Sequence, residues 1–172
     1  MHQVDMNYPA QKEQMYELLT KQVEAILEGE SDVIANLSNV SALLNEALSD
    51  INWVGFYLMK NDELILGPFQ GKLACVHIKI GKGVCGTAVA TKRTQLVENV
   101  HEFPGHIACD CRSNSEIVVP IVINEKVFGV LDVDSPLIGR FDQTDLYYLE
   151  KIIEIIIEHC NWSACGKYDF NK

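Results

Sequence analysis

The hydrophobic residues of this chain change their spacing twice, from a helical period to a strand period and back again. Apolar residues recur at three- and four-residue steps over residues 10–28 and again over residues 31–48, where Ser31 is the predicted N-cap. The same spacing returns over residues 143–159, behind Asp142 as the predicted cap. The pattern therefore predicts two helices at the start, one helix at the end and a region of strands between them.

The central region is rich in aromatic and β-branched residues that occur in short runs between turn residues, which is typical of strands. A short alanine-rich helix is expected within it, over residues 84–92, after a glycine turn. We expect about six strands: residues 52–59, a strand beginning at 64, residues 73–80, 95–98, 115–123 and 127–133. Helices at both ends of consecutive hairpins predict an α+β fold with a mainly antiparallel sheet packed against helices.

The length of 172 residues and the apolar content of 48% suit one domain with one substantial core. We expect a single domain over residues 1–172. Its parts would be the N-terminal helices in 1–50, the sheet and a long loop in 51–142, the last helix in 143–160 and a tail in 161–172.

The charge and the cysteine count restrict the class of protein. A formal charge of -10 argues against a nucleic-acid partner, because phosphate backbones are bound by clustered Lys and Arg. No apolar run has the form of a signal peptide or the length of a membrane span, so we expect a cytoplasmic protein without membrane contact. In that compartment, six cysteines indicate catalysis or metal binding rather than a disulfide scaffold.

The cysteines lack the C-x-x-C spacing that is common in zinc sites and thioredoxin-like motifs. Cys75 is expected within a strand, where a thiol is usually buried and inert. Cys85 is expected at a helix start, where backbone N–H groups and the helix dipole favour the thiolate. Cys109 lies in a long polar loop, residues 99–114, where no packing role explains it. No role is assigned to Cys111, Cys160 and Cys165.

Three carboxylates are expected to meet on one face of the sheet. Asp132 and Asp134 alternate with apolar residues at the end of a strand, so both point to the same side. If strands 115–123 and 127–133 form a hairpin, Glu116 lies near them. Such a cluster is costly without a cation. The pattern indicates either a pocket for a metal ion or an ammonium group, or a solvated strand end with ordinary surface acids.

Two large aromatic residues make a comparable pattern on the first strand. Trp53 and Tyr57 are four residues apart, which places both rings on one face of the sheet. Most such pairs belong to a core. If the carboxylates share this face, however, the rings could form the wall of a small-ligand pocket, and the spacing alone leaves both interpretations open.

Five strings, in this order, resemble the family of free methionine-R-sulfoxide reductases, which are GAF-domain enzymes. They are GPFQGKLAC at 67–75, GKGVCG at 81–86, FPGHIACD at 103–110, SNSEIVVP at 113–120 and GVLDVDSP at 129–136. The similarity runs from about Asn52 to Asp145. It implies a GAF-like fold, reduction of the R epimer of the free amino acid, regeneration by thioredoxin or a similar dithiol donor, and no metal or organic cofactor.

The resemblance also implies roles for single residues. Cys109 corresponds to the cysteine that attacks the sulfoxide, Cys75 to the cysteine that resolves the product, and Cys85 to a third redox cysteine. The substrate would be bound by five side chains, Trp53, Tyr57, Glu116, Asp132 and Asp134. Cys111 departs from the family pattern, which leaves an alternative resolving thiol open.

The implied activity proceeds through a cysteine sulfenic acid, an intramolecular disulfide and reduction by an external dithiol. Two other functions stay open. One is a non-catalytic GAF module that senses a small ligand or a redox state. The other is a zinc protein that uses Cys75, Cys85, Cys109 and Cys111. The oligomeric state is also open, with a homodimer as one candidate.

Overall fold

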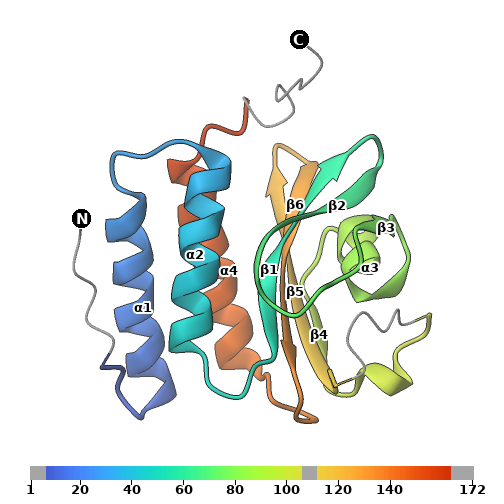
Figure 1. The fold of residues 1–172 in the computed structure, drawn as a ribbon, viewed down its shortest axis with the longest axis horizontal. Helices are drawn as coiled ribbons and strands as arrows, with labels where there is room; N and C mark the ends of the chain where they lie inside the picture. Colours follow the sequence, from blue (N-terminus) through green and yellow to red (C-terminus); the bar gives the residue numbers. More distant parts are fainter. Residues whose placement is uncertain (1–6, 106–111, 164–172) are drawn as a thin grey trace.

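A six-stranded antiparallel sheet separates three long helices from one short helix (Figure 1). The computed structural model describes residues 7–105 and 112–163. The helices are α1 (Lys12–Leu27), α2 (Val33–Ala47), α3 (Gly83–Thr91) and α4 (Gln143–His159), with a 3-10 turn η1 (Val100–Glu102). The strands are β1 (Trp53–Lys60), β2 (Glu63–Gly71), β3 (His77–Lys79), β4 (Gln95–Val97), β5 (Ser115–Ile123) and β6 (Lys126–Ser135), in the order β3-β2-β1-β6-β5-β4. The predicted α+β fold is confirmed.

The predicted N-cap of the second helix is wrong by one residue. The cap is Asp32, whose carboxylate accepts a hydrogen bond from the Ala35 N–H at 2.9 Å. Ser31 lies outside the helix, where its own N–H donates to the Glu30 carboxylate at 2.7 Å. Both residue types are good caps, so composition alone did not separate them.

The predicted strand over residues 73–80 is also too long. Within this range only the three residues of β3 pair with β2. Residues 72–76 form a loop, so Cys75 lies in a loop and not in a strand. Leu73 and Val76 are apolar, but their side chains are 91% and 54% exposed. An apolar run is typical of a buried strand, but apolar residues also occur on surfaces.

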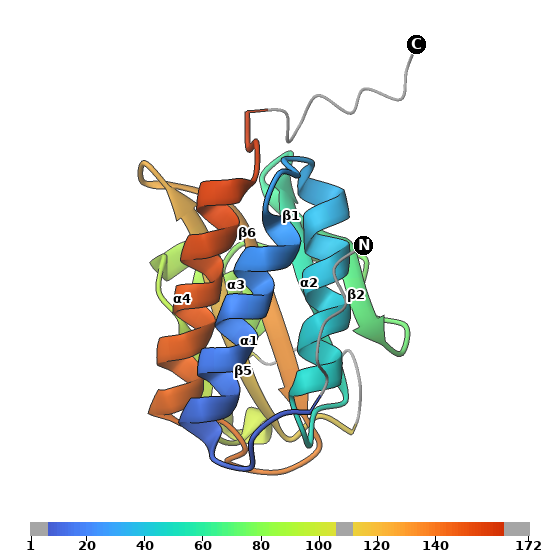
Figure 2. The same cartoon turned by 90° about the vertical axis from the view of Figure 1, so that its left-hand side faces the viewer.

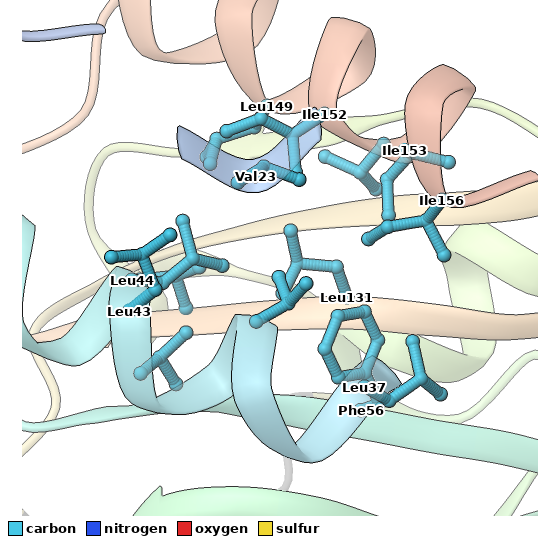
Figure 3. Packing of buried hydrophobic residues seen from close by; sticks show 14 of the residues in the cluster. Val23, Leu37, Leu43, Leu44, Phe56, Leu131, Leu149, Ile152, Ile153 and Ile156 are labelled. Atoms are coloured by element: carbon cyan, nitrogen blue, oxygen red, sulfur yellow. The ribbon is translucent and has the colours of Figure 1, made fainter. Parts of the chain in front are cut away.

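The three long helices lie on one side of the sheet: α2 and α4 pack against it, and α1 packs on the outside of α2 and α4 (Figure 2). Buried residues of α2 and α4, among them Leu37 and Ile152, pack toward Phe56 of β1 and Leu131 of β6 (Figure 3). A side chain of this size contributes about 1.5–3 kcal/mol when it is fully buried. This layer therefore holds most of the buried apolar side chains, and it leaves the other face of the sheet for a smaller cluster.

The opposite face of the sheet is covered by α3 (Figure 1). Its apolar cluster includes Trp53 and Tyr57 of β1, Cys85 of α3 and Val130 of β6. Within the described ranges, none of the helices has both the length and the apolar character needed to cross a bilayer. The residues singled out in the sequence gather in this thinner layer beneath α3.

A buried carboxylate joins the start of α4 to α1. Asp145 is fully buried and accepts hydrogen bonds from the Tyr16 hydroxyl at 2.7 Å and the Arg140 guanidinium at 3.1 Å. It also forms an ion pair with Lys12 and completes a capping box with Asp142. Because a buried carboxylate is tolerated only when it is paired, these contacts hold α1 against α4.

We expect Asp145→Asn to lower the free energy of unfolding by about 2–3 kcal/mol, because the substitution leaves two cations without their buried partner. The loss stays below that of a fully buried pair, since the Lys12 and Arg140 side chains are 28% and 11% exposed. Denaturant unfolding followed by circular dichroism measures the change. Tyr16→Phe removes one hydrogen bond of the same carboxylate and should cost only about 1 kcal/mol. An Asp145→Asn effect no larger than that of Tyr16→Phe contradicts the prediction.

Candidate active site

The sheet register places the predicted pocket residues side by side under α3. Trp53 of β1 lies opposite Asp134 of β6, and Asp134 lies opposite Glu116 of β5. Two residues further along β1, Gly55 lies opposite Asp132. Because side chains alternate between the two faces of a strand, these positions share one face. The expected hairpin between the two strands, and the meeting of three carboxylates on it, are both observed.

Cys85 reaches this row of side chains from α3. Its sulfur lies 3.9 Å from the Glu116 carboxyl, and one ligand atom each of Cys85, Glu116 and Asp132 lie within 4.8 Å of one another. The helix comes this close because Gly86 has no side chain. A Cβ at that position would lie 2.4 Å from the backbone oxygen of Lys79. The α3 helix therefore packs directly against the end of β3 and places its thiol among the acids.

Burial dominates the electrostatics of this cluster. It raises the pKa of Glu116 well above the ordinary value, and the nearby charges of Asp132 and Asp134 raise it further. Burial also raises the pKa of Asp132, to about 7, although hydrogen bonds with Cys85 and Glu116 act in the opposite direction. Both groups therefore take up a proton more readily than ordinary carboxyl groups do, and Asp132 does so near neutral pH.

The expectation of a thiolate at Cys85 is wrong. Burial raises the pKa of the Cys85 thiol well above its ordinary value, and the charges of Asp132 and Glu116 raise it further. The helix start would lower it, but a helix terminus contributes only about 0.3–1 kcal/mol at a typical site. The loss of solvation and the neighbouring carboxylates outweigh the dipole, so Cys85 is a protonated thiol.

One oxygen of this cluster lacks a hydrogen-bond partner among the residues that the structure describes. Asp132 is 6% exposed, and its Oδ1 accepts no hydrogen bond. A buried acceptor without a donor costs about 1–3 kcal/mol, more when it is charged. A cationic ligand group with N–H donors would satisfy it. The sulfur and two carboxyl groups could also hold a metal ion, which would first have to displace their protons.

Aromatic rings form the side of the site next to the carboxylates. Trp53 stacks on Tyr57 at 5.8 Å between ring centroids and on Phe69 of β2 at 5.3 Å. The Trp53 indole N–H donates to the backbone oxygen of Lys72 at 3.1 Å, which orients the ring. A Cβ at Gly55 would lie 2.8 Å from the Trp53 ring, so glycine is needed for this packing.

The described cysteines have three different environments. Cys75 is half-buried, packs against the cluster beneath α3 and is disulfide-bonded. Cys85 and Cys160 are both thiols, and Cys160 is buried in the main core, where it accepts a hydrogen bond from the Asn36 amide at 3.4 Å. Cys109, the predicted nucleophile, lies outside the described residues, as do Cys111 and Cys165.

Comparison with known proteins agrees with this geometry. The GAF domain family matches residues 36–156. The chain is 53% identical over 142 residues to the free methionine-R-sulfoxide reductase of Escherichia coli K12. The match covers 83% of this chain and 86% of that protein. The chain belongs to the free methionine-R-sulfoxide reductase family. The resemblance that five short strings indicated is thereby confirmed over most of the sequence.

Solved structures of this reductase family have the same fold. The free methionine-R-sulfoxide reductase from Neisseria meningitidis in complex with its substrate is 42% identical, with a TM-score of 0.87, and the match covers 91% of this chain and 95% of that one. The protein named fRMsr of Staphylococcus aureus, also in complex with substrate, is 60% identical, with a TM-score of 0.81. The match covers 84% of this chain and 94% of that one. The predicted GAF fold is therefore confirmed.

Phe69 is an aromatic residue of the site that the sequence patterns did not predict. Phe69 stacks on Trp53. If the β1–β2 hairpin kept the pairing that it has next to the turn at Asn61, Gly55 would lie opposite Pro68. A β-bulge between Gly55 and Tyr57 shifts the register by one residue and brings Phe69 opposite Gly55. The only sequence signal was its place in the string 67–75.

Proposed function

We propose that this chain reduces free L-methionine-R-sulfoxide to methionine by cysteine chemistry. The observation that carries the proposal is the buried Asp132 oxygen without a partner, next to the carboxyl group of Glu116 and the stacked rings of Trp53 and Tyr57. A carboxylate in a closed apolar setting favours an ammonium group, and aromatic rings favour an uncharged thioether-like chain. A free amino acid with a methionine side chain carries both features.

The ammonium group would also explain selectivity. In a peptide the same nitrogen is an uncharged amide, which cannot neutralise Asp132 and leaves the carboxylate buried without a counter-charge. Asp134, half-buried on the same face, adds negative potential. The site is thus suited to the free amino acid and unsuited to the same residue within a protein chain.

In the proposed reaction, Cys109 attacks the sulfoxide sulfur. Glu116 is the proposed proton donor to the sulfoxide oxygen, because burial and the neighbouring acids raise its pKa and so favour its protonated form. The oxygen passes to the cysteine, so that methionine leaves and a cysteine sulfenic acid remains. The sulfur of the substrate is reduced by two electrons, and that of Cys109 is oxidised by two.

Cys75 would then condense with the sulfenic acid to form a disulfide and one water molecule. Its location at the edge of the site and its disulfide-bonded state support this role. A thioredoxin-type dithiol restores both thiols and is itself oxidised. Cys85, the third proposed redox cysteine, is too deeply buried to pass the disulfide to an external donor, and its thiol instead hydrogen-bonds the acids. A cytoplasmic location would provide the donor.

The test uses the purified full chain with dithiothreitol and four separate substrates. These are the R and S epimers of free methionine sulfoxide, N-acetyl-methionine-R-sulfoxide and a peptide that contains the R epimer. Chromatography of released methionine should show turnover of the free R epimer and little of the others. The N-acetyl compound is the matched control because it lacks only the ammonium charge. Equal turnover of the N-acetyl compound, or none of the free R epimer, contradicts the proposal.

A further inference from the structure

The surface next to Cys75 is unusually apolar. Seven large hydrophobic side chains are exposed in the described residues, and three of them lie within residues 73–80. Leu73 is 91% exposed, Val76 is 54% exposed and Ile80 is 43% exposed. Leu73 and Val76 lie within the loop of Cys75, and Ile80 directly follows β3, the strand that forms one edge of the sheet (Figure 1). Apolar side chains grouped in this way are typical of a surface that contacts another protein.

The same segment is the only long acid-free part of an acidic chain. The sequence has 24 Asp and Glu residues, but none occurs over residues 64–97, where five Lys and Arg residues lie. Lys72, Lys79 and Lys82 are exposed, and none of them forms an ion pair with a residue in the described ranges. The nearest acid in sequence, Glu63, is paired with His77 at 3.1 Å. The segment around Cys75 therefore carries a net positive charge in a chain of net charge -10.

We propose that this surface docks the dithiol protein that reduces the Cys75 disulfide, and that this donor carries negative charge around its own thiols. The docking surface consists of Leu73, Val76 and Ile80 with the lysines 72, 79 and 82. The inference rests on the proposed function, because it names the place where the electron donor binds. It adds that charge selects the donor and its orientation.

The physical reason lies in the geometry of thiol–disulfide exchange. The donor thiolate must reach one sulfur of the disulfide, so its protein has to sit on the surface around Cys75. An acidic donor is repelled by most of this chain and attracted by one patch, which steers it to the correct face. The exposed apolar side chains at the patch supply contact area in a small, transient interface with a charged rim.

The test measures reduction of the disulfide directly, without methionine sulfoxide. The oxidised full chain is mixed with a reduced thioredoxin of negative net charge or with dithiothreitol, and thiols are quantified by alkylation over time. The triple variant Lys72→Glu/Lys79→Glu/Lys82→Glu should lower the second-order rate constant for thioredoxin at least 10-fold at low salt. The rate constant for dithiothreitol should change less than twofold. Added salt should lower the rate constant for reduction of the natural chain by thioredoxin, but not the rate constant for the triple variant.

A matched variant, Lys21→Glu/Lys151→Glu, reverses exposed charges on α1 and α4, across the sheet from Cys75. It should reduce the thioredoxin rate constant less than threefold. The inference is overturned if the triple variant reacts with thioredoxin as fast as the natural chain, or if the double variant is slowed equally. The proposed function fails separately, when the free R epimer is not reduced with dithiothreitol, and the rate constants above do not depend on that assay.

Discussion

A Cys109→Ser variant is expected to lose reduction of free methionine-R-sulfoxide by at least about 1000-fold, since a nucleophile has no substitute in covalent catalysis. The described cysteines support this expectation by their environments. Cys85 is buried and has a raised pKa, and Cys160 is buried in the main core on the other face of the sheet. Cys75 is the proposed resolving cysteine, and its disulfide is the product of the reaction. Cys85 and Cys160 are therefore unsuited to attack on a bound sulfoxide.

Binding should survive in the same variant, because the carboxylates and the rings are unchanged. Isothermal titration with methionine should give a dissociation constant within about threefold of that of the natural chain, as expected when a transition-state interaction alone is lost. Cys111→Ser, two residues away, is the matched control and should keep most of the turnover. Full turnover in Cys109→Ser would contradict the nucleophile assignment. If neither the natural chain nor the variant turns over while both bind, the chain is a ligand-sensing module.

Asp132→Asn is expected to lower kcat/KM for the free R epimer by about 100- to 1000-fold, the usual loss when one partner of a buried charged pair is removed. Its Oδ1 is the buried acceptor that an ammonium group would occupy. Steady-state kinetics with dithiothreitol measure the change. Asp62→Asn is the control, since Asp62 is exposed in the turn after β1 and should leave kcat/KM unchanged. A decrease smaller than 10-fold contradicts ammonium binding at Asp132.

The pH dependence of kcat/KM follows from the same residue. Burial raises the pKa of Asp132 to about 7, so kcat/KM of the natural chain should fall as the pH decreases below about 7 and the carboxylate takes up a proton. In Asp132→Asn this limb of the profile should disappear. A natural-chain profile that stays flat from pH 8 to pH 5 would exclude this assignment.

The pH dependence of the free energy of unfolding should be opposite to that of kcat/KM. The folded-state pKa of Asp132 lies above its ordinary value of 3.8, so the folded chain binds more protons than the unfolded chain between about pH 4 and pH 7. This group therefore lowers stability as the pH rises through that range. Above pH 7, Asp132→Asn should unfold at a higher temperature than the natural chain, measured by calorimetry. Lost activity with gained stability would mark Asp132 as a functional group that costs folding energy.

Features that depend on local geometry could be predicted from the amino-acid sequence. The period of apolar residues predicted the three long helices, the last one with its cap, Asp142, and a run of small residues after a glycine turn predicted the short helix. The alternation of side chains along β5 and β6 put Glu116, Asp132 and Asp134 on one face, because this alternation holds for any extended chain. Five short strings identified the family, which no periodicity could do.

Features that depend on how distant segments meet could not be predicted in this way. The bulge in β1 brought Phe69 onto Trp53, and the turn alone predicts a different partner. Cys85 is a protonated thiol because α3 buries it among carboxylates, a loss of solvation that exceeds the local effect of the helix start. Spacing along a strand or helix is a property of the backbone, whereas register shifts and burial arise from contacts between elements that the local sequence does not encode.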